Sequence, residues 1–418
     1  MQSWMKSLLL TFLGALAIAY VGACVLFRAG ENQFVFTRNF TYIPPSVSLA
    51  LNQERVQLAD GDTKFVAWVI PSLPQDRSDK WLLFFHGAGD NLSLDVNAYD
   101  MFRSMGFNIM APEYPGYLDA PGEPNEAMLE REAQAAYNYL RSVKSVPARN
   151  IVIFGSSLGA AVAIDLASRV EAAALVEHAG FSSLVAMNQK KYPLLPTSFL
   201  TKNRFESDKK IGRVKMPVLL IHSTEDNVIP FAHAERLHEF APAPKKLVKV
   251  QGGHGVSQRS AKEIPNFYGA IANFLNAEAG FRLRQPLPSI APVIAETLDS
   301  KGIEAALAQY RLLRKEAPPR YNFRESELNQ LGYDYLGDDK HDEAIAVLKL
   351  NTEQFPQSFN TFDSLGDAYD AAGKEAEAIA SYRQSVALFS DKANYSRPKL
   401  DRLEHQSRSR QAGPGPLN

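Results

Sequence analysis

The sequence predicts an α/β fold in the middle of the chain, with a mostly parallel sheet covered by helices on both faces, and an all-α region in the last third. Two observations predict this organisation. Apolar runs of four to six residues alternate with helical patterns through the middle, as expected for strands buried on both faces. In the last third, a set of residues recurs at a spacing of 34, the period of a helical repeat.

The composition excludes several classes of protein. Of the 418 residues, 45% are apolar and 22% are charged, and the formal net charge is −1. Because there is no basic excess to neutralise phosphates, we expect no nucleic-acid partner. Cys24 is the only cysteine, so neither a disulfide nor a cysteine-based metal site can form within one chain.

Residues 1–30 form a candidate membrane segment. Leu8–Phe27 contains twenty residues without a charge, between Lys6 and Arg28, and as a helix it would span roughly 30 Å. Three interpretations stay open: a retained anchor, a cleaved signal peptide, and lipidation at Cys24, which ends a sequence similar to a lipoprotein cleavage box. We favour the retained anchor. The flanking charges nearly balance, and we expect the folded part to lie on the extracytoplasmic side.

The predicted sheet domain, residues 31–284, begins with a β-hairpin. Two alternating apolar segments flank Asp60-Gly61, a dipeptide that favours a two-residue hairpin turn. Buried strands are then predicted at Trp81–Phe85, Phe107–Met110, Ile151–Phe154, Ala173–Val176, Val218–Ile221 and Leu247–Val250. The clearest helical patterns between them are Glu123–Ser145 and Leu158–Val170.

A strand, a sharp turn and a helix are predicted around Ser157. The pentapeptide Gly155–Gly159 follows an apolar strand and precedes an apolar helix. In a nucleophile elbow the serine occupies a strained turn, and glycines two residues away prevent collisions. We therefore predict Ser157 as a nucleophile and the Leu158 amide as a donor to the oxyanion. The alternative is an ordinary glycine-rich turn with a surface serine.

Three more loops follow predicted strands, at the edge where α/β sheets bind ligands. In the first, the amide of Ala88 is the expected second oxyanion donor, and His86 is expected to brace the loop. Asp226, in the second, is the candidate carboxylate that orients an imidazole. His254 lies between glycines in the third and is the candidate base. Glu177, after another strand, is the rival of Asp226.

The order Ser157, Asp226, His254 is the one expected of a serine hydrolase built on such a sheet. On these features, residues from about Glu31 to Leu275 resemble the α/β-hydrolase superfamily, and more narrowly the membrane-anchored bud-emergence-type serine hydrolases. The matching stretches are Phe84–Gly87, Tyr114–Tyr117, Pro121–Pro124, the Ser157 elbow, Phe181–Leu184, Pro217–His222, Asp226–Pro230 and Gly252–His254.

The sequence departs from this family pattern at two places. Ala88 stands where relatives often carry asparagine, which argues against a side-chain contribution to the oxyanion hole. Residues 113–115 are Glu-Tyr-Pro where many relatives have Asp-Tyr-Arg, and we attach no functional consequence to that change.

The resemblance implies two-step acyl transfer through an acyl-enzyme on Ser157, with neither a metal nor an organic cofactor. The expected substrates are small carboxylic esters or thioesters. The segment 182–214 is much shorter than a typical lipase lid, which suggests a small cap over an open pocket. The alternative is that this segment only packs on the sheet.

A proline-containing linker is predicted at 285–297, followed by tetratricopeptide-like repeats at 298–396. The repeated features are Leu331-Gly332, Tyr335, Glu343–Ile345 and Phe355, which recur as Leu365-Gly366, Tyr369, Glu377–Ile379 and Phe389. Ile303–Leu313 is predicted as an additional helix outside this phase. The polar tail, 397–418, is predicted to be disordered.

Three functions stay open at this point. The favoured one is a membrane-tethered serine hydrolase. The second is a scaffold whose repeats bind a protein partner and whose hydrolase domain is vestigial. The third is a serine peptidase, because the same triad cleaves amides.

Overall fold

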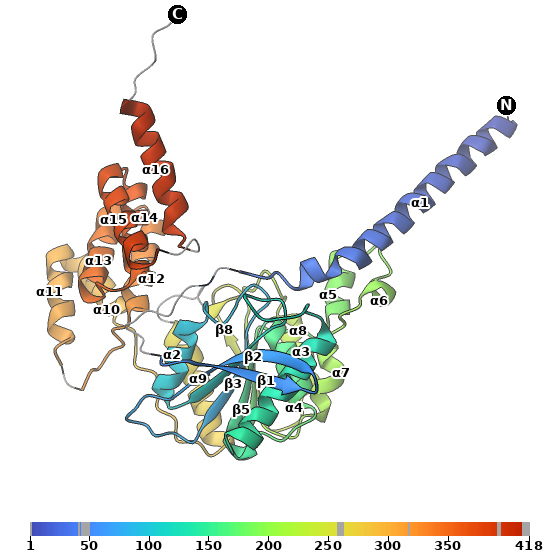
Figure 1. The fold of residues 1–418 in the computed structure, drawn as a ribbon, viewed down its shortest axis with the longest axis horizontal. Coiled ribbons are helices and arrows are strands. Elements are labelled where there is room, and N and C mark those ends of the chain that lie inside the picture. The colour runs from blue at the N-terminus through green and yellow to red at the C-terminus, as the bar shows by residue number, and fades with distance from the viewer. Residues whose placement is uncertain are drawn as a thin grey trace, which may run out of the picture.

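The computed structural model describes residues 2–40, 42, 51–256, 263–316, 318–390 and 394–411. It has three parts: a long N-terminal helix, a domain built around a sheet, and a stack of helices at the other side of the sheet domain (Figure 1).

An eight-stranded sheet forms the centre of the middle domain, in the order β1-β2-β4-β3-β5-β6-β7-β8. Strand β2 pairs antiparallel with β1 and with β4, and the remaining pairs are parallel, which confirms the predicted fold class. The strands are β1 (Glu54–Asp60), β2 (Thr63–Ile70), β3 (Trp81–Phe85), β4 (Asn108–Glu113), β5 (Ile151–Ser156), β6 (Ala174–His178), β7 (Val218–Ser223) and β8 (Lys245–Val250).

Both faces of the sheet are covered because its central strands are apolar on both sides. In β5, Ile151 and Ile153 join one core cluster with helices α3 and α4, whereas Val152 and Phe154 join the other with α2 and α9. Burial of each such side chain contributes about 1.5–3 kcal/mol. The helices of this domain are α2 (Val96–Met105), α3 (Glu126–Asn138), α4 (Leu158–Ala167), α5 (Leu184–Lys191), α6 (Thr197–Leu200), α7 (Ser207–Lys210), α8 (Ala232–Phe240) and α9 (Glu263–Glu278).

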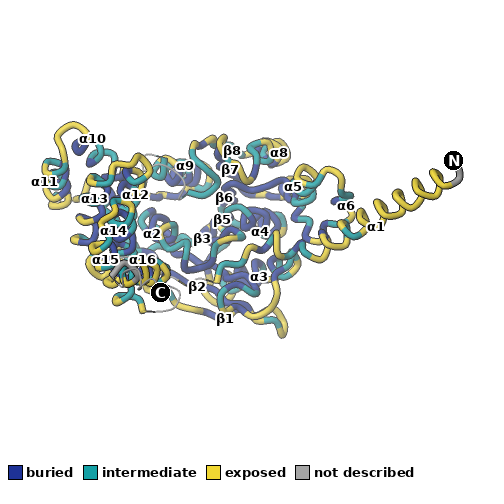
Figure 2. Tube along the Cα trace, turned by 90° about the horizontal axis from the view of Figure 1, so that it is seen from above, coloured by how far each residue is buried: buried dark blue, intermediate teal, exposed yellow. Residues whose placement is uncertain are grey.

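The N-terminal helix α1 (Gln2–Val35) extends away from the domain and is exposed over most of its length (Figure 2). Its segment Trp4–Val35 is long and apolar enough to cross a membrane, with a mean hydropathy of 2.3 in its most apolar window. A signal sequence would have the same length and composition. The last turns of α1 pack on the domain, where Phe27 and Glu31 are buried.

The C-terminal part is made of helices that pack in consecutive pairs, α10 with α11, α12 with α13 and α14 with α15. Gly332 lies where a β-carbon would overlap the Leu348 side chain, and Gly366 lies in the same way against Tyr382. The two contacts are offset by the same 34 residues as the sequence repeat. The helices are α10 (Ala291–Lys301), α11 (Ile303–Leu313), α12 (Glu325–Gly337), α13 (His341–Gln354), α14 (Phe359–Ala371), α15 (Glu375–Leu388) and α16 (Ser396–Gln411).

One boundary in this part differs from the prediction. The predicted linker 285–297 ends early, because α10 already begins at Ala291, with Ile294 fully buried in the helical core. The additional helix Ile303–Leu313 is confirmed as α11 and is the partner of α10.

The predicted disorder of the tail is wrong for residues 397–411, which belong to α16. Leu400 and Leu403 are buried in a cluster with Tyr382. Lys399 forms ion pairs with Asp363 at 2.9 Å and with Asp367 at 2.6 Å. A few apolar contacts and a shared charge cluster therefore hold a helix of mostly polar sequence. Residues 412–418 lie outside the described residues.

The helical part contacts the sheet domain through polar side chains. Arg324, directly before α12, contacts two residues of α2. Its guanidinium donates to the Asp100 carboxylate, and its Nη1 lies 3.0 Å from Met101 Sδ. The helices thus contact the sheet domain next to α2.

Candidate active site

Ser157 occupies a strained turn between β5 and α4. Its φ is 55° and its ψ is −115°, a conformation that is costly for a residue with a β-carbon. A β-carbon at Gly155 would overlap the carbonyl of Gly159, and one at Gly159 would overlap the carbonyl of Phe85 in β3. Both glycines are therefore required by close backbone contacts, as the elbow pattern predicts.

The structure brings Ser157, His254 and Asp226 into one chain of hydrogen bonds. His254 Nε2 lies 2.9 Å from Ser157 Oγ, and His254 Nδ1 lies 2.7 Å from Asp226 Oδ2. The three residues come from the loops after β5, β8 and β7. A serine hydroxyl, an imidazole and a carboxylate in this order can transfer the hydroxyl proton to the imidazole.

The Asp226 carboxyl is held in its ionised form. Burial raises its pKa, but hydrogen bonds from His222, His254 and the Ile229 amide lower it more, so the net pKa lies well below the usual range. Asp226 Oδ1 accepts from the amides of Val228 and Ile229, both at 2.8 Å. A carboxylate fixed on one oxygen by two amides leaves the other oxygen directed at the imidazole.

His222 is a further partner of Asp226 that sequence reasoning missed. It is fully buried, and its Nε2 lies 3.4 Å from Asp226 Oδ2 and 2.8 Å from the Ile229 carbonyl. Burial lowers its pKa, but Asp226 and Glu177 raise it more. The position at the end of β7, four residues before Asp226, is the sequence signal that would have found it.

In the loop after β3, the backbone carbonyls of three consecutive residues accept hydrogen bonds from other protein groups. The His86 carbonyl accepts from Tyr114 Oη at 2.8 Å, and the Ala88 carbonyl accepts from Tyr117 Oη at 2.9 Å. The Gly87 carbonyl accepts from the Asp90 amide at 3.2 Å. Such tethering fixes the direction in which the Ala88 amide points. Leu158, the first residue of α4, has an amide without an intrahelical acceptor.

His86 braces this loop, as expected, and its partner is Glu113. His86 Nε2 lies 3.1 Å from Glu113 Oε1, and Glu113 Oε2 accepts from the Leu92 amide at 3.0 Å. Burial lowers the pKa of His86, but the hydrogen bond and charge of Glu113 raise it above the ordinary value. Glu113 thus connects the end of β4 to the loop after β3. An acid ending an apolar strand must be paired, and that rule would have identified it.

Glu177, the rival acid, does not take part in the hydrogen-bonded chain. Its Oε1 accepts from the Gly180 amide, and its other oxygen is buried without a hydrogen-bond partner among the described residues. Burial raises the pKa of Glu177 to about 7, although the charge of His222 opposes this. The geometry therefore favours Asp226 over Glu177 as the acid.

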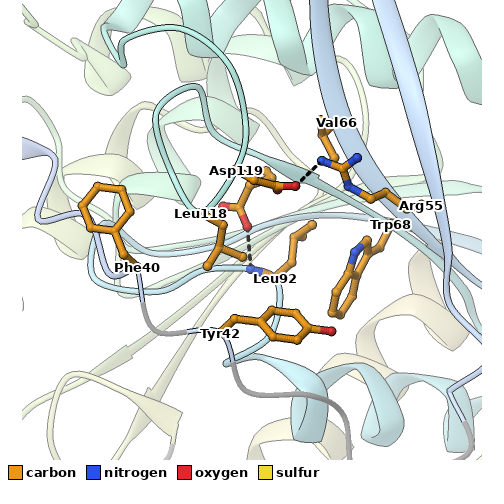
Figure 3. A pocket seen from close by; sticks show the side chains of 9 residues that line it. Phe40, Tyr42, Arg55, Val66, Trp68, Leu92, Leu118 and Asp119 are labelled. Carbon is orange, nitrogen blue, oxygen red and sulfur yellow. Dashed lines mark hydrogen bonds and ion pairs between the residues drawn. The ribbon is translucent and has the colours of Figure 1, made fainter. Parts of the chain in front are cut away.

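Two cavities lie near these loops. One, of about 480 Å³, is lined by Leu92 of the loop after β3 and by Glu113 at the end of β4, but by none of the predicted site residues (Figure 3). Arg55 and Asp119 form an ion pair of 2.8 Å at its rim. The other, of about 380 Å³, is lined by Ser156 and Gly255, the direct neighbours of Ser157 and His254. The smaller cavity is the one that borders the candidate site.

The smaller cavity has walls of different character. Aromatic side chains of the sheet domain line one side, including Phe84, Phe154 and Tyr268. The other side is polar and comes from α12, with Asn329 and Gln330. Among the described residues, no group of three His, Cys, Asp or Glu side chains could hold a metal ion.

Comparisons with known proteins agree on the sheet domain. Residues 111–261 match the Dienelactone hydrolase family, and residues 39–177 match the Chlamydia CHLPS protein family. An uncharacterized protein of Mycobacterium tuberculosis is 32% identical over 249 residues, which cover 57% of this chain and 88% of that protein. The alpha/beta hydrolase domain-containing protein aho-3 of Caenorhabditis elegans is 30% identical over 230 residues, 54% of this chain and 67% of its own. An esterase of Pyrococcus furiosus superposes with a TM-score of 0.47 at 20% identity, over 58% of this chain and 98% of the esterase.

Proposed function

Because this chain belongs to the α/β-hydrolase superfamily, we propose that it is a membrane-anchored serine hydrolase that cleaves carboxylic esters or thioesters. One observation carries the proposal: Ser157, in a strained elbow, is hydrogen-bonded through His254 to the buried carboxylate of Asp226.

In the first step His254 Nε2 accepts the proton of Ser157 Oγ while that oxygen attacks the carbonyl carbon of the substrate. Asp226 holds the imidazole with its Nδ1–H directed at Oδ2 and stabilises the imidazolium that forms. The negative charge that develops on the carbonyl oxygen is met by the amides of Ala88 and Leu158. Each such donor lowers the barrier by about 3–4 kcal/mol in comparable sites.

The tetrahedral intermediate then expels the alcohol or thiol, to which the His254 imidazolium returns the proton. Water enters, loses a proton to His254 and attacks the acyl-enzyme, which releases the acid and regenerates the Ser157 hydroxyl. Every proton in this cycle passes through one imidazole, so no further acid or base is needed.

We propose that α1 is a retained anchor and that the hydrolase domain lies on the extracytoplasmic side. Contacts between α1 and the domain support retention: Tyr20 Oη donates to the Leu194 carbonyl at 3.0 Å, and the rings of Phe27 and Tyr192 meet at 5.3 Å. A leader that is removed would not be expected to pack against the folded domain. Protease protection of the domain in sealed vesicles of defined orientation tests the side.

We propose that the helical part is a tetratricopeptide-like stack. The matched close contacts at Gly332 and Gly366 support this, together with the consecutive pairing of α10–α15. The stack is a candidate site for a protein partner. In addition, its helix α12 supplies the polar wall of the cavity next to Ser156. An effect of the α12 variant Gln330→Ala on KM would support a role of this wall in substrate binding.

A fluorophosphonate probe tests the proposed enzyme activity. Labelling of the wild type should disappear in Ser157→Ala and persist in Ser156→Ala, a matched control whose hydroxyl lies 3.0 Å from His178 Nδ1 instead. Absence of labelling in folded wild-type protein would favour the scaffold function. Among substrates, p-nitrophenyl esters should be cleaved faster than peptides, and the opposite preference would favour the peptidase.

A further inference from the structure

A short cap lies beside the N-terminal helix. It runs from Ser182 to Val214, between β6 and β7, and contains α5, α6 and α7. In both views α5 and α6 lie next to the C-terminal half of α1, whose N-terminal half extends beyond them (Figures 1 and 2). The cap is therefore the part of the domain that lies nearest to the candidate membrane span.

The position of the cap relative to α1 is fixed by buried contacts. Glu31 is 2% exposed, and its carboxylate accepts from the amides of Lys202 at 2.9 Å and Asn203 at 3.2 Å. Arg28 donates to the carbonyls of Phe199 at 3.4 Å and Leu200 at 3.2 Å. A buried carboxylate bound by two amides resists movement, because separation would leave the charge without partners.

Two large apolar side chains of the cap are turned to the outside. Leu194 is 85% exposed and Phe199 is 83% exposed, more than any other large apolar side chain in the described ranges. Both lie next to α1, since the Leu194 carbonyl accepts from Tyr20 and the Phe199 carbonyl accepts from Arg28. Exposed apolar groups that continue an apolar surface indicate a partner that is itself apolar.

The contact with Tyr20 sets the depth of Leu194 along the span. Tyr20 lies seven residues before Phe27, the end of the uncharged segment, which corresponds to about 10 Å along a helix. Leu194 is thus level with the apolar segment rather than beyond its end. If Leu8–Phe27 crosses a bilayer, Leu194 must enter the same leaflet.

The charge of the cap fits a membrane surface. The segment from Ser182 to Val214 holds seven Lys or Arg and two Asp or Glu, although the whole chain is nearly neutral. Lys190 and Lys191 are exposed in the last turn of α5, next to the loop that carries Leu194. Apolar side chains flanked by lysines are typical of surfaces that insert into bilayers with anionic headgroups.

The same edge of the domain carries the candidate active site. The chain that leaves α1 crosses the loop after β3, where Asn91 Nδ2 donates to the Asn39 carbonyl at 3.0 Å. Thr37 Oγ1 lies 3.6 Å from the β-carbon position of Gly89. The loop that contains Ala88 is therefore one short segment away from the end of the span.

We propose that the cap is a membrane-docking surface, which inserts Leu194 and Phe199 into a bilayer with anionic lipid, and that the site takes its acyl ester from that bilayer. This inference rests on the proposed anchor and hydrolase. It adds that the substrate is a lipid-phase ester and identifies the side chains that bring the site to it.

Insertion is tested first, without reference to activity. The full chain, with Cys24→Ser, is labelled with an environment-sensitive fluorophore at Leu194→Cys or Phe199→Cys and reconstituted into phosphatidylcholine vesicles with or without phosphatidylglycerol. Leu312, 68% exposed on α11, provides the matched control as Leu312→Cys. Lipid-borne quenchers should reduce the signal at 194 and 199 at least threefold more than at 312. Equal quenching at the three positions would overturn the proposal.

Substrate delivery is tested second. Leu194→Ser with Phe199→Ser should lower the hydrolysis of a long-chain ester embedded in vesicles at least fivefold and leave that of soluble p-nitrophenyl acetate unchanged. Leu312→Ser should change neither. An equal loss on both substrates, or no loss on either, would reject delivery from the bilayer. If the wild type hydrolyses neither ester, the proposed function fails, while the quenching result still decides whether the cap inserts.

Discussion

Glu113 should be essential for the position of the loop after β3, which carries the proposed oxyanion donor Ala88, although Glu113 is not itself one of the proposed catalytic residues. It accepts hydrogen bonds from His86 Nε2 and from the Leu92 amide, and both groups are buried. In Glu113→Gln the amide oxygen can accept only one of these bonds and its NH₂ group faces the other donor. The loop that carries Ala88 then loses one of its fixed ends.

The magnitude follows from the two bonds. One buried donor left without an acceptor costs about 1–3 kcal/mol of folding stability. If the loop shifts so that the Ala88 amide no longer meets the oxyanion, the barrier rises by a further 3–4 kcal/mol or about 10²–10³-fold in kcat. We therefore expect a variant that folds, with a large loss of kcat and a small change in KM.

The loss of stability should depend on pH. His86 has a pKa above its ordinary 6.5 in the folded protein because Glu113 favours the charged ring. A raised pKa stabilises the fold fully below the unfolded value and loses this contribution as the pH rises through the folded value. The wild type should therefore exceed Glu113→Gln in stability most below pH 6.5.

Urea unfolding at pH 6 and pH 9, together with kcat and KM, provides the assay. Glu132→Gln is the matched control, since Glu132 is fully buried with both oxygens unpaired among the described residues, and burial raises its pKa well above the ordinary value. Glutamine has nearly the same size as glutamate, and burial at this position disfavours a charge, so the substitution should change neither the stability at neutral pH nor kcat. A Glu113→Gln variant with wild-type kcat would refute the assigned role of the loop brace.

Three further predictions concern the acid, the buried glutamate and the helical stack. Asp226→Asn should lower kcat about 10³–10⁴-fold, because the imidazole loses its orienting carboxylate, whereas Glu177→Gln should keep near-normal kcat; the reverse pattern would transfer the role to Glu177. Burial raises the pKa of Glu177 from 4.5 to about 7, so its contribution to stability is full below pH 4.5 and is lost as the pH rises through 7. Between pH 4.5 and pH 7 the free energy of unfolding of Glu177→Gln should therefore rise by about 3 kcal/mol relative to that of the wild type, as measured by urea unfolding. A difference between the two proteins that does not change with pH would contradict a raised pKa of Glu177. Gly332→Ala should destabilise the helical stack by about 1–3 kcal/mol in thermal unfolding, since a β-carbon there overlaps Leu348, whereas Gly337→Ala, with open space around it, should be neutral or stabilising; equal effects would argue against the close helix contact.

The fold could be predicted because each central strand is an unbroken apolar run. Such runs are typical of strands buried on both faces, and the six predicted strands appear as β3–β8. The edge strand β8 is the exception in burial, because only Val250 is buried in it. Their ends were less predictable. Strand β4 begins one residue later than predicted and continues to Glu113, because the polar end of the strand pairs with the loop after β3 rather than with solvent.

The partners of the site were harder to predict than its proposed nucleophile, base and acid. Ser157 and His254 stand in glycine-rich turns, which mark them in the sequence. Glu113 and His222 lie at strand ends without such a pattern, and only the folded chain shows what they contact. Their positions at strand ends mark both residues in the sequence, but do not say which groups they contact after folding.

The helical tail was mispredicted for a similar reason. Its composition is polar, but Leu400 and Leu403 are three residues apart and reach a cluster that includes Tyr382. The stabilising charges, Asp363 and Asp367, come from α14, more than thirty residues earlier. The composition of a segment does not show which surface of the folded protein the segment will pack against.

The site of covalent modification tests the central claim most directly. Wild-type protein treated with a fluorophosphonate is digested with trypsin, and the peptide from Asn150 to Arg169, which contains Ser156, Ser157 and Ser168, is fragmented in a mass spectrometer. The account predicts a single adduct on Ser157, lost when His254 is replaced by alanine. An adduct on Ser156 or Ser168, or labelling of Ser157 that does not require His254, would contradict it.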